Sequence, residues 1–105
     1  MNTRMTNTPL ESEIETFFTK CLDMHMPWVE HRKYKTRRND PDRIILFNNG
    51  RVEFVELKRP KEEPRPGQLR EHERLRERGF VVEVVTTRDE VWEWIQKRLQ
   101  PAYWR

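Results

Sequence analysis

The sequence predicts an α/β domain with a central mixed sheet flanked by helices. Near the N-terminus, between Leu10 and Leu22, apolar residues recur at helical spacing. Two short runs of strand character follow, and Asn48-Asn49-Gly50 between them is a strong hairpin signal. A charged helical stretch then ends at Gly79 and leads into the mostly apolar run FVVEVV, residues 80–85, which predicts a helix followed by a strand.

Composition limits the core and the class of protein. The chain has 105 residues, 34% hydrophobic and 37% charged, so we expect one domain with a thin core, for which dimerisation would bury more apolar surface. A net charge of +3 is too small to identify a nucleic-acid-binding protein. Cys21 is the only cysteine, which excludes a disulfide framework and favours a reducing compartment. No apolar run approaches the roughly 18 residues of a membrane span, and no signal peptide is evident, so a cytoplasmic protein is expected.

The first helix is predicted to run to about Met24. Thr8 is the candidate N-cap, Pro9 the first helical residue, and Glu11, three residues after the cap, completes a capping box. On a helical wheel Glu11 also falls within the apolar stripe, where a carboxylate needs a partner. Glu11 is therefore either a capping residue or a site residue, and Glu15, one turn later, is the reserve candidate for the second role.

An edge strand and a hairpin are predicted next. Residues 28–38, WVEHRKYKTRR, are interpreted as an edge strand and a loop. The runs 42–47 and 51–58 should pair antiparallel across the Asn-Asn-Gly turn. Residues 59–66 contain three prolines and no apolar residue, which predicts a loop.

The C-terminal part of the chain adds two helices and a strand. A charged helix over 68–78 ends at Gly79, a strand covers 80–85, and Asp89 is the candidate cap of a last helix through Leu99. The predicted order is α, β, β, β, α, β, α.

The length of the hairpin loop decides whether two carboxylates meet. In a three-residue loop, Gly50 takes the left-handed position of a bulge and Phe47 lies opposite Arg51. Counting outward then places Asp42 opposite Glu56, with Cβ atoms about 5 Å apart, so that both could hold one divalent ion. In a two-residue turn the carboxylates would be split across the sheet. A metal site therefore requires the bulged loop.

Glu56 and Lys58 share a strand face with the apolar residues Val52 and Phe54. Magnesium takes oxygen ligands and keeps several waters, so two carboxylates and a backbone carbonyl can hold it against a phosphate. A lysine beside the ion can orient the attacking water and offset charge on the phosphate. The alternative is that these residues are ordinary charges at the solvated end of an edge hairpin.

With Pro41-Asp42, the hairpin, Glu56-Leu57-Lys58 and the helix opening with Gln68, the chain resembles the PD-(D/E)XK nuclease superfamily. More narrowly it resembles a stand-alone VRR-NUC domain, the virus-type replication and repair nuclease module of phages and bacteria. The resemblance covers about residues 10–87, followed by a C-terminal helix at 89–99. It implies a restriction-endonuclease-like core and a site made of metal ligands (Asp42, Glu56 and the Leu57 carbonyl), a catalytic lysine (Lys58) and helix-borne polar residues (Gln68 and Glu11).

One departure from the family pattern concerns the approach to the aspartate. Family members often carry a Gly-x-Pro-Asp stretch, whereas this chain has Arg38-Asn39-Asp40-Pro41-Asp42, which affects the shape of the loop and not the ligand set. Gln68 shares a helix face with His72 and Leu75 and can point toward the sheet. It could equally be a polar residue in the first turn of a helix.

Other polar residues have competing interpretations. His25, His31 and His72 lack metal-ligand spacing and are interpreted as surface or packing residues, although His72 could reach the site or DNA. The basic run of residues 32–38 leads into Asp42 and is the candidate phosphate-contacting track, with Arg32, Lys33, Lys35, Arg37 and Arg38 as the DNA-binding residues. Ordinary ion pairing with interleaved glutamates is favoured for Arg70, Arg74 and Arg78.

The last helix has an apolar stripe, which leaves three aromatic residues, Trp92, Tyr103 and Trp104, without an assigned partner. They suggest either a subunit interface or packing across the protein's own sheet. A two-fold dimer would present two basic runs and two metal sites, which matches a substrate of the same symmetry. Stand-alone members of the family are likewise expected to act on branched DNA.

The sequence thus predicts a Mg²⁺ or Mn²⁺-dependent DNA endonuclease of a bacterial or phage-infected cell. We expect a homodimer that cuts Holliday-type junctions by paired nicks. The alternative from another class is a non-catalytic nucleic-acid-binding module on a nuclease scaffold. It is disfavoured because Asp42, Glu56 and Lys58 are all present in order.

Overall fold

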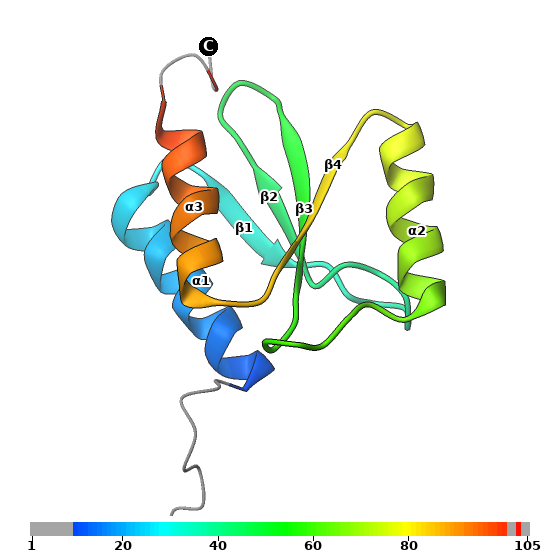
Figure 1. The fold of residues 1–105 in the computed structure, drawn as a ribbon. Helices are drawn as coiled ribbons and strands as arrows, with labels where there is room; N and C mark the ends of the chain where they lie inside the picture. The colour runs from blue at the N-terminus through cyan, green and yellow to red at the C-terminus, as the bar shows by residue number, and fades with distance from the viewer. Residues whose placement is uncertain (1–9, 101–102, 104–105) are drawn as a thin grey trace, which may run out of the picture.

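The computed structural model describes residues 10–100 and residue 103. Its elements follow the predicted order (Figure 1). They are helices α1 (Glu11–His25), α2 (Pro66–Glu77) and α3 (Arg88–Leu99) and strands β1 (Glu30–Lys33), β2 (Arg43–Leu46), β3 (Val52–Leu57) and β4 (Val81–Val85). None of the helices described is long and apolar enough to cross a membrane.

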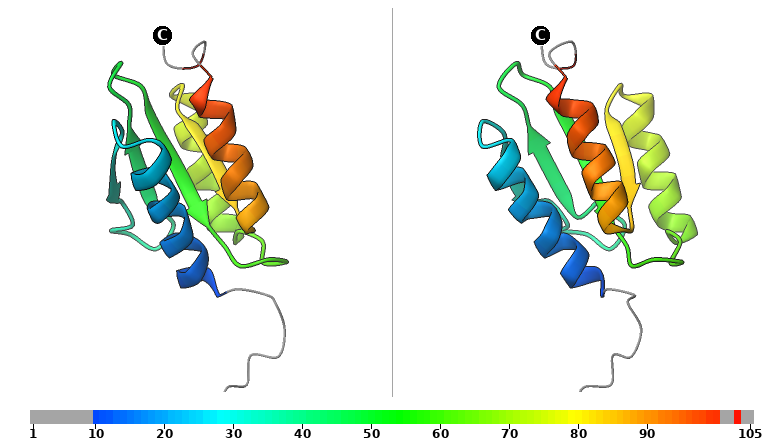
Figure 2. Two further views of the ribbon diagram at one scale, coloured as in Figure 1. Left: turned by 90° about the vertical axis from the view of Figure 1, so that its left-hand side faces the viewer. Right: turned by 60° about the vertical axis from the view of Figure 1, so that its left-hand side comes forward.

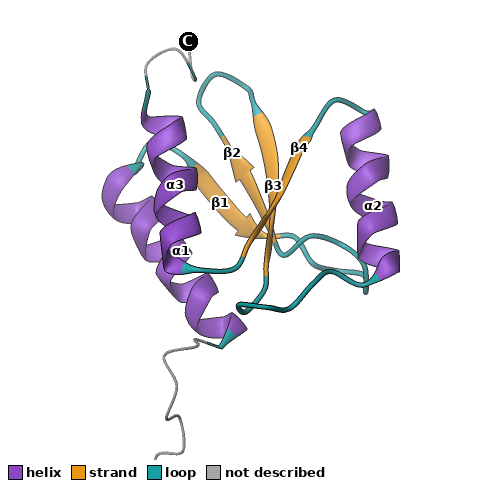
Figure 3. Ribbon diagram, viewed as in Figure 1, coloured by secondary structure: helices purple, strands orange, loops and turns teal. Residues whose placement is uncertain are grey.

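The four strands form one mixed sheet in the order β1-β2-β3-β4 (Figure 3). The pairs β1–β2 and β2–β3 are antiparallel, and β3–β4 is parallel because α2 carries the chain back between them. Figure 2 shows α1 and α3 side by side over one face of the sheet, with α2 on the other. The predicted central mixed sheet flanked by helices is confirmed.

Alternation along β3 divides the core into two layers. Val55 and Leu57 point toward α1 and α3 and belong to the larger cluster, which also holds Phe18 and Trp94 with ring centroids 5.1 Å apart. Phe54 points toward α2 and joins a smaller cluster that includes Leu75 and Val82. Because successive strand residues face opposite sides, the glutamates of this strand fall into different layers as well.

The hairpin adopts the three-residue loop. Arg43 pairs with Val55 and Leu46 with Val52. The Phe47 amide donates to the Arg51 carbonyl at 2.9 Å. Gly50 has φ +87°, the left-handed conformation that a bulged loop requires and that glycine adopts without strain. The predicted register is confirmed, and extending it by one residue places Asp42 opposite Glu56.

The cap predicted for the last helix is wrong. Thr87, not Asp89, is the N-cap of α3, and its hydroxyl accepts a 3.0 Å hydrogen bond from the Glu90 amide. Glu90 in turn accepts from the Thr86 amide at 2.7 Å, so the helix starts one residue before Asp89. The Thr87-x-x-Glu90 spacing is a capping-box pattern that the preference for Asp89 overlooked.

The cap predicted for the first helix is wrong. Leu10 is the N-cap of α1 and the helix begins at Glu11, so Thr8 and Pro9, which lie outside the described residues, are not its cap and first residue. In α1 the Leu10 amide donates to Glu13 Oε1 at 2.8 Å, so Glu13 returns to the backbone three residues before it.

The aromatic residues near the C-terminus have different surroundings. Tyr103 packs across the protein's own sheet, with its ring 6.0 Å from that of Phe47 and the Arg51 guanidinium 4.3 Å above it. Trp92 is 39% exposed and stacks edge-on with His25. Trp104 lies outside the described residues.

Candidate active site

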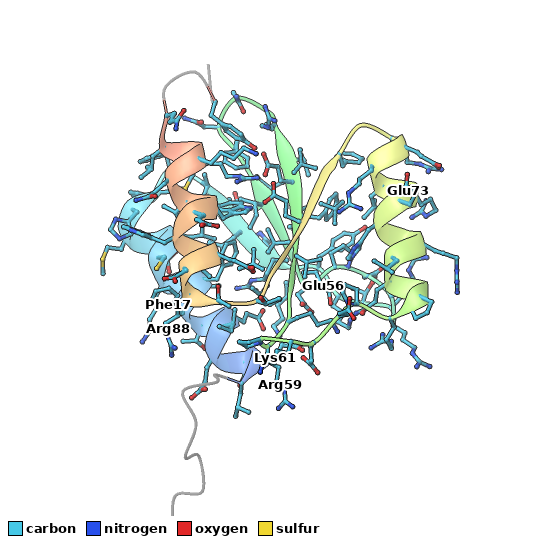
Figure 4. The ribbon with its side chains drawn as sticks, in the orientation of Figure 1. Phe17, Glu56, Arg59, Lys61, Glu73 and Arg88 are labelled. Atoms are coloured by element: carbon cyan, nitrogen blue, oxygen red, sulfur yellow. The ribbon has the colours of Figure 1, made fainter. Side chains whose placement is uncertain are left out.

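Glu56 is the central carboxylate of the site, at the carboxyl end of β3 and facing α2 (Figure 4). Its side chain is 1% exposed. Oxygen Oε2 accepts a 2.9 Å hydrogen bond from Gln68 Nε2 and lies 3.7 Å from Lys58 Nζ. Oxygen Oε1 has no hydrogen-bond partner in the part of the chain that the structure describes. A buried charge with one oxygen unsatisfied is costly unless a ligand completes it.

Asp42 joins Glu56 from the start of β2. One of its oxygens accepts a 2.7 Å hydrogen bond from the Leu57 amide, which fixes the carboxylate across the end of the hairpin. Burial, followed by the charge of Glu56, raises the pKa of Asp42 from 3.8 to about 6, against the opposing effect of the Leu57 hydrogen bond. The two carboxylates therefore share a poorly solvated space in which their charges repel.

Lys58 and Glu11 complete the charged surroundings of this pair. Lys58 is 7% exposed and is held by its amide, which donates to the Val85 carbonyl of β4 at 3.1 Å. Burial raises the pKa of Glu11, Lys58 opposes that effect, and the charge of Glu56 adds to it. Glu11, the first residue of α1, thus lies within electrostatic reach of the site, as its site interpretation requires. Its capping interpretation is wrong, because Leu10 is the N-cap and Glu13, not Glu11, accepts from the backbone amide there.

Gln68 has both of its expected roles at once. Its side-chain oxygen accepts from the Arg65 amide at 2.9 Å and so caps α2, while its nitrogen donates to Glu56. The preceding Gly67 lies against Asn39, and a Cβ atom there would come within 2.8 Å of the Asn39 side chain. A larger residue at position 67 would therefore require the Asn39 side chain to move, and glycine lets the first turn of α2 lie against the loop before Asp42 with Asn39 in its present position.

Asp40 organises the loop that precedes Asp42. It is 2% exposed, and its Oδ2 accepts hydrogen bonds from the amides of Thr36 and Arg37 at 3.3 and 2.9 Å. Burial alone would raise the pKa of Asp40, but these hydrogen bonds outweigh it and hold the pKa below its usual value. The approach loop is thus shaped by a side chain that caps backbone amides.

The basic run of residues 32–38 divides into two groups. Arg32 bonds to Glu30, and Lys33 lies 3.8 Å from Glu15 on α1, away from the paired carboxylates. Lys35, by contrast, lowers the pKa of Asp42 and donates to the Asp40 carbonyl. The other two candidates lie on the approach loop: Arg37 pairs with Asp40, and the Arg38 carbonyl accepts from Arg65.

The reserve candidate and two of the histidines lie elsewhere. Glu15 pairs with Lys33 and with Arg43 at 3.6 Å, on the α1 side of the sheet. His31 bonds to Asp23, and His25 packs on Trp92. His72, interpreted from sequence as a packing residue, is fully buried with Nε2 3.8 Å from Glu56 Oε1. Its position four residues after Gln68 on the same helix face was the signal for this placement.

The donor set fits a divalent cation that prefers oxygen ligands. Asp42 and Glu56 converge, one Glu56 oxygen is unpaired among the described residues, and burial, followed by the charge of Glu56, raises the pKa of Asp42. Within residues 10–100 and 103, no three His, Cys, Asp or Glu side chains form a metal-binding group. A cation here would depend on two carboxylates, the Leu57 carbonyl and water.

Comparisons with known proteins agree with this fold. No protein-family model matches the chain. "Putative nuclease p44" of Acyrthosiphon pisum secondary endosymbiont phage 1 is 49% identical over 53 residues, a match that spans 50% of this chain and 57% of that protein. A solved structure described as a VRR_NUC domain has a TM-score of 0.71 and 32% identity, over 82% of this chain and 94% of that one. Because that domain is matched over nearly its whole length at this identity, the chain belongs to the VRR-NUC domain family.

Proposed function

We propose that the chain is a metal-dependent DNA endonuclease that hydrolyses phosphodiester bonds. The observation that carries the proposal is the buried, incompletely paired Glu56 carboxylate facing Asp42. Lys58 is the cation nearest to this pair, 3.7 Å from Glu56 Oε2, so one lysine faces two buried carboxylates, whereas a buried pair kept only for stability would be expected to be more fully compensated. The nuclease-type fold and the phage relative support the same activity.

Each residue of the site has a defined part. Asp42, Glu56 and the Leu57 carbonyl would hold Mg²⁺ or Mn²⁺, which when bound supplies Lewis-acid polarisation of the phosphate. Lys58, held against Glu56, orients the attacking water and offsets negative charge that develops on the phosphate. Gln68 holds the Glu56 carboxylate by its hydrogen bond, and Glu11 contributes to the charge of the site from α1.

DNA would approach across the loop that precedes Asp42. Lys35, Arg37 and Arg38 are exposed there and can contact phosphates on the way to the site. Arg32 and Lys33 lie on the edge strand β1, outside this loop, so we assign them a smaller part.

We further propose a homodimer that acts on branched DNA such as a Holliday junction, by one nick from each site. The small chain offers one site and limited surface for gripping DNA, and a two-fold dimer would pair two sites for a two-fold substrate. Exposed apolar side chains on α1 and α3, Met24 at 73% and Trp92 at 39%, could be covered by a second copy. In this proposal residues 1–105 act as a single domain in the cytoplasm of a bacterial or phage-infected cell.

A nicking assay tests the activity. Supercoiled plasmid, linear duplex, flap and four-way junction are incubated with the protein in Mg²⁺, Mn²⁺ or EDTA. We expect nicking that requires the metal, is fastest on the junction and is absent in Glu56→Gln. A protein that shifts DNA without cutting under any metal condition would be the binding module instead, and activity in EDTA would exclude the metal site.

Light scattering tests the assembly. We expect twice the monomer mass at the concentration that cleaves junctions. A monomer at that concentration, or equal cleavage of linear duplex and junction, would leave a generic nuclease as the better description.

A further inference from the structure

His72 is a buried side chain to which the proposed mechanism assigns no role. It is 0% exposed, and neither ring nitrogen has a hydrogen-bond partner among residues 10–100 and 103. A neutral imidazole carries one N–H in either tautomer, and a buried donor without an acceptor costs about 1–3 kcal/mol. A histidine kept for packing alone would thus be a poor choice beside Phe54 and Leu75 in the apolar layer under α2.

The acceptor that faces His72 is the unpaired oxygen of the site. Nε2 of His72 lies 3.8 Å from Glu56 Oε1, the oxygen that has no partner. The other oxygen is bonded by Gln68, one helical turn earlier on the same face of α2. Two α2 side chains thus approach the carboxylate, one toward each oxygen, and Lys58 is the cation near it at 3.7 Å.

We propose that His72 is a positioning residue: with Gln68 it fixes the rotation of the Glu56 carboxylate, so that the carboxylate presents a defined edge to the cation and to Asp42. The inference rests on the proposed metal-dependent function and adds a residue to it. Groups that orient a metal-binding carboxylate from behind typically change metal affinity about 10–100-fold when removed.

The test compares two substitutions of similar size. His72→Phe removes the ring nitrogens and retains an aromatic side chain, whereas His72→Gln retains an N–H donor. Mn²⁺ affinity is measured by isothermal titration calorimetry, and the thermal midpoint is measured in EDTA. We expect His72→Phe to bind Mn²⁺ about 10–100-fold more weakly at an unchanged or higher midpoint. His72→Gln should keep most of the affinity, and excess Mn²⁺ should restore most of the kcat of His72→Phe.

His31→Gln is the matched control, because His31 bonds to Asp23 and lies away from the site. It should bind Mn²⁺ as the wild type does. Two results would overturn the inference: His72→Phe with wild-type Mn²⁺ affinity, or equal weakening in His72→Phe and His72→Gln, which would indicate a packing role. A wild-type protein that neither binds Mn²⁺ nor cleaves DNA would instead reject the proposed function itself.

An NMR measurement covers the case in which His72→Phe does not fold. The ¹⁵N shifts of His72 in the wild type report which ring nitrogen carries the proton. We expect the proton on Nε2, and a changed Nε2 shift in Glu56→Gln, in which the carboxylate charge is removed. A proton on Nδ1 in the folded protein would overturn the inference.

Discussion

Glu53 and Glu56 lie three residues apart on β3 and are both buried, at 0% and 1% exposure, yet their surroundings differ. Glu53 faces α3 and is fully compensated: Arg98 Nε donates to it at 2.8 Å, Arg51 Nε at 2.9 Å, and the Tyr103 hydroxyl also donates. Glu56 faces α2 and has one amide hydrogen bond, a lysine at 3.7 Å and an unpaired oxygen.

The contrast distinguishes a charge that supports the fold from one that is kept for a ligand. The Arg98 guanidinium at one Glu53 oxygen and two further donors at the other satisfy Glu53 within the protein, as a structural buried ion pair requires. Around Glu56 the compensation is incomplete, and a second carboxylate is placed beside it. We therefore interpret Glu53 as a structural carboxylate on one face of this strand and Glu56 as the proposed functional one on the other.

Glu56→Gln should have the largest effect on activity. It removes a proposed metal ligand and leaves the Gln68 hydrogen bond possible, so cleavage should fall to background and Mn²⁺ binding by calorimetry should be lost. The fold should persist in circular dichroism, because an incompletely paired charge is removed. An active Glu56→Gln protein would show that the Glu56 carboxylate is not needed for cleavage.

Lys58→Met should separate chemistry from metal binding. The substitution keeps the length of the buried side chain but removes the ammonium 3.7 Å from Glu56. We expect cleavage to drop about 10²–10³-fold with Mn²⁺ affinity retained. Single-turnover cleavage and calorimetry on the same sample measure the two effects, and parallel loss of both would assign Lys58 a structural role.

Glu53→Gln should show the opposite pattern, a loss of stability. It leaves the buried Arg98 without its main anionic partner, which typically costs about 3–5 kcal/mol in unfolding free energy. Denaturant unfolding at neutral pH checks this value, and Mn²⁺ affinity of the folded fraction should equal that of the wild type. An unchanged unfolding free energy would show that the ion pair between Glu53 and Arg98 does not stabilise the fold.

Asp42→Asn should stabilise the metal-free protein at neutral pH. The folded pKa of Asp42 is raised from 3.8 to about 6, so its contribution to stability is fully present below pH 3.8 and lost as the pH rises through 6. At pH 7 the loss corresponds to roughly 3 kcal/mol, an upper value for a side chain that keeps slight solvent contact.

Unfolding in EDTA at pH 4 and pH 7 measures this effect. The gap between Asp42→Asn and the wild type should widen at pH 7, and Mn²⁺ should narrow it by stabilising only the wild type. A stability difference that is equal at both pH values would mean that the folded protein does not raise the pKa of Asp42.

Charge changes in the basic run should have the smallest effect. Lys35→Ala should lower the slope of log binding constant against log salt concentration by about one, as expected for one lost phosphate contact. Arg32→Ala should leave it unchanged, because that side chain is paired with Glu30. Junction binding measured by anisotropy in EDTA over a salt series tests this pair, and equal slopes in both variants would reject the division of the run.

Local chemistry made much of the fold and the core of the site predictable. A glycine at the left-handed position of a short loop set the hairpin register, and the register brought Asp42 to Glu56. Strand alternation then placed Lys58 beside them, and helical spacing placed Gln68 and His72 toward the same carboxylate. Each of these relations depends on residues only a few positions apart in the sequence.

Contacts between distant segments were not predictable in the same way. The Glu53 network joins β3 to Arg98 and Tyr103, which are 45 and 50 residues further along the chain, and no local pattern indicates that pairing. For the same reason the division of the basic run depends on Glu15 of α1, which only the folded chain brings to Lys33.

Anomalous scattering from crystals grown with Mn²⁺ shows directly whether Asp42 and Glu56 hold the cation. We expect a strong peak between the Asp42 and Glu56 carboxylates, next to the Leu57 carbonyl, in the wild type and its absence in Glu56→Gln. A protein that cleaves DNA in Mn²⁺ but shows no peak there, or binds its ion at another place, would contradict this expectation.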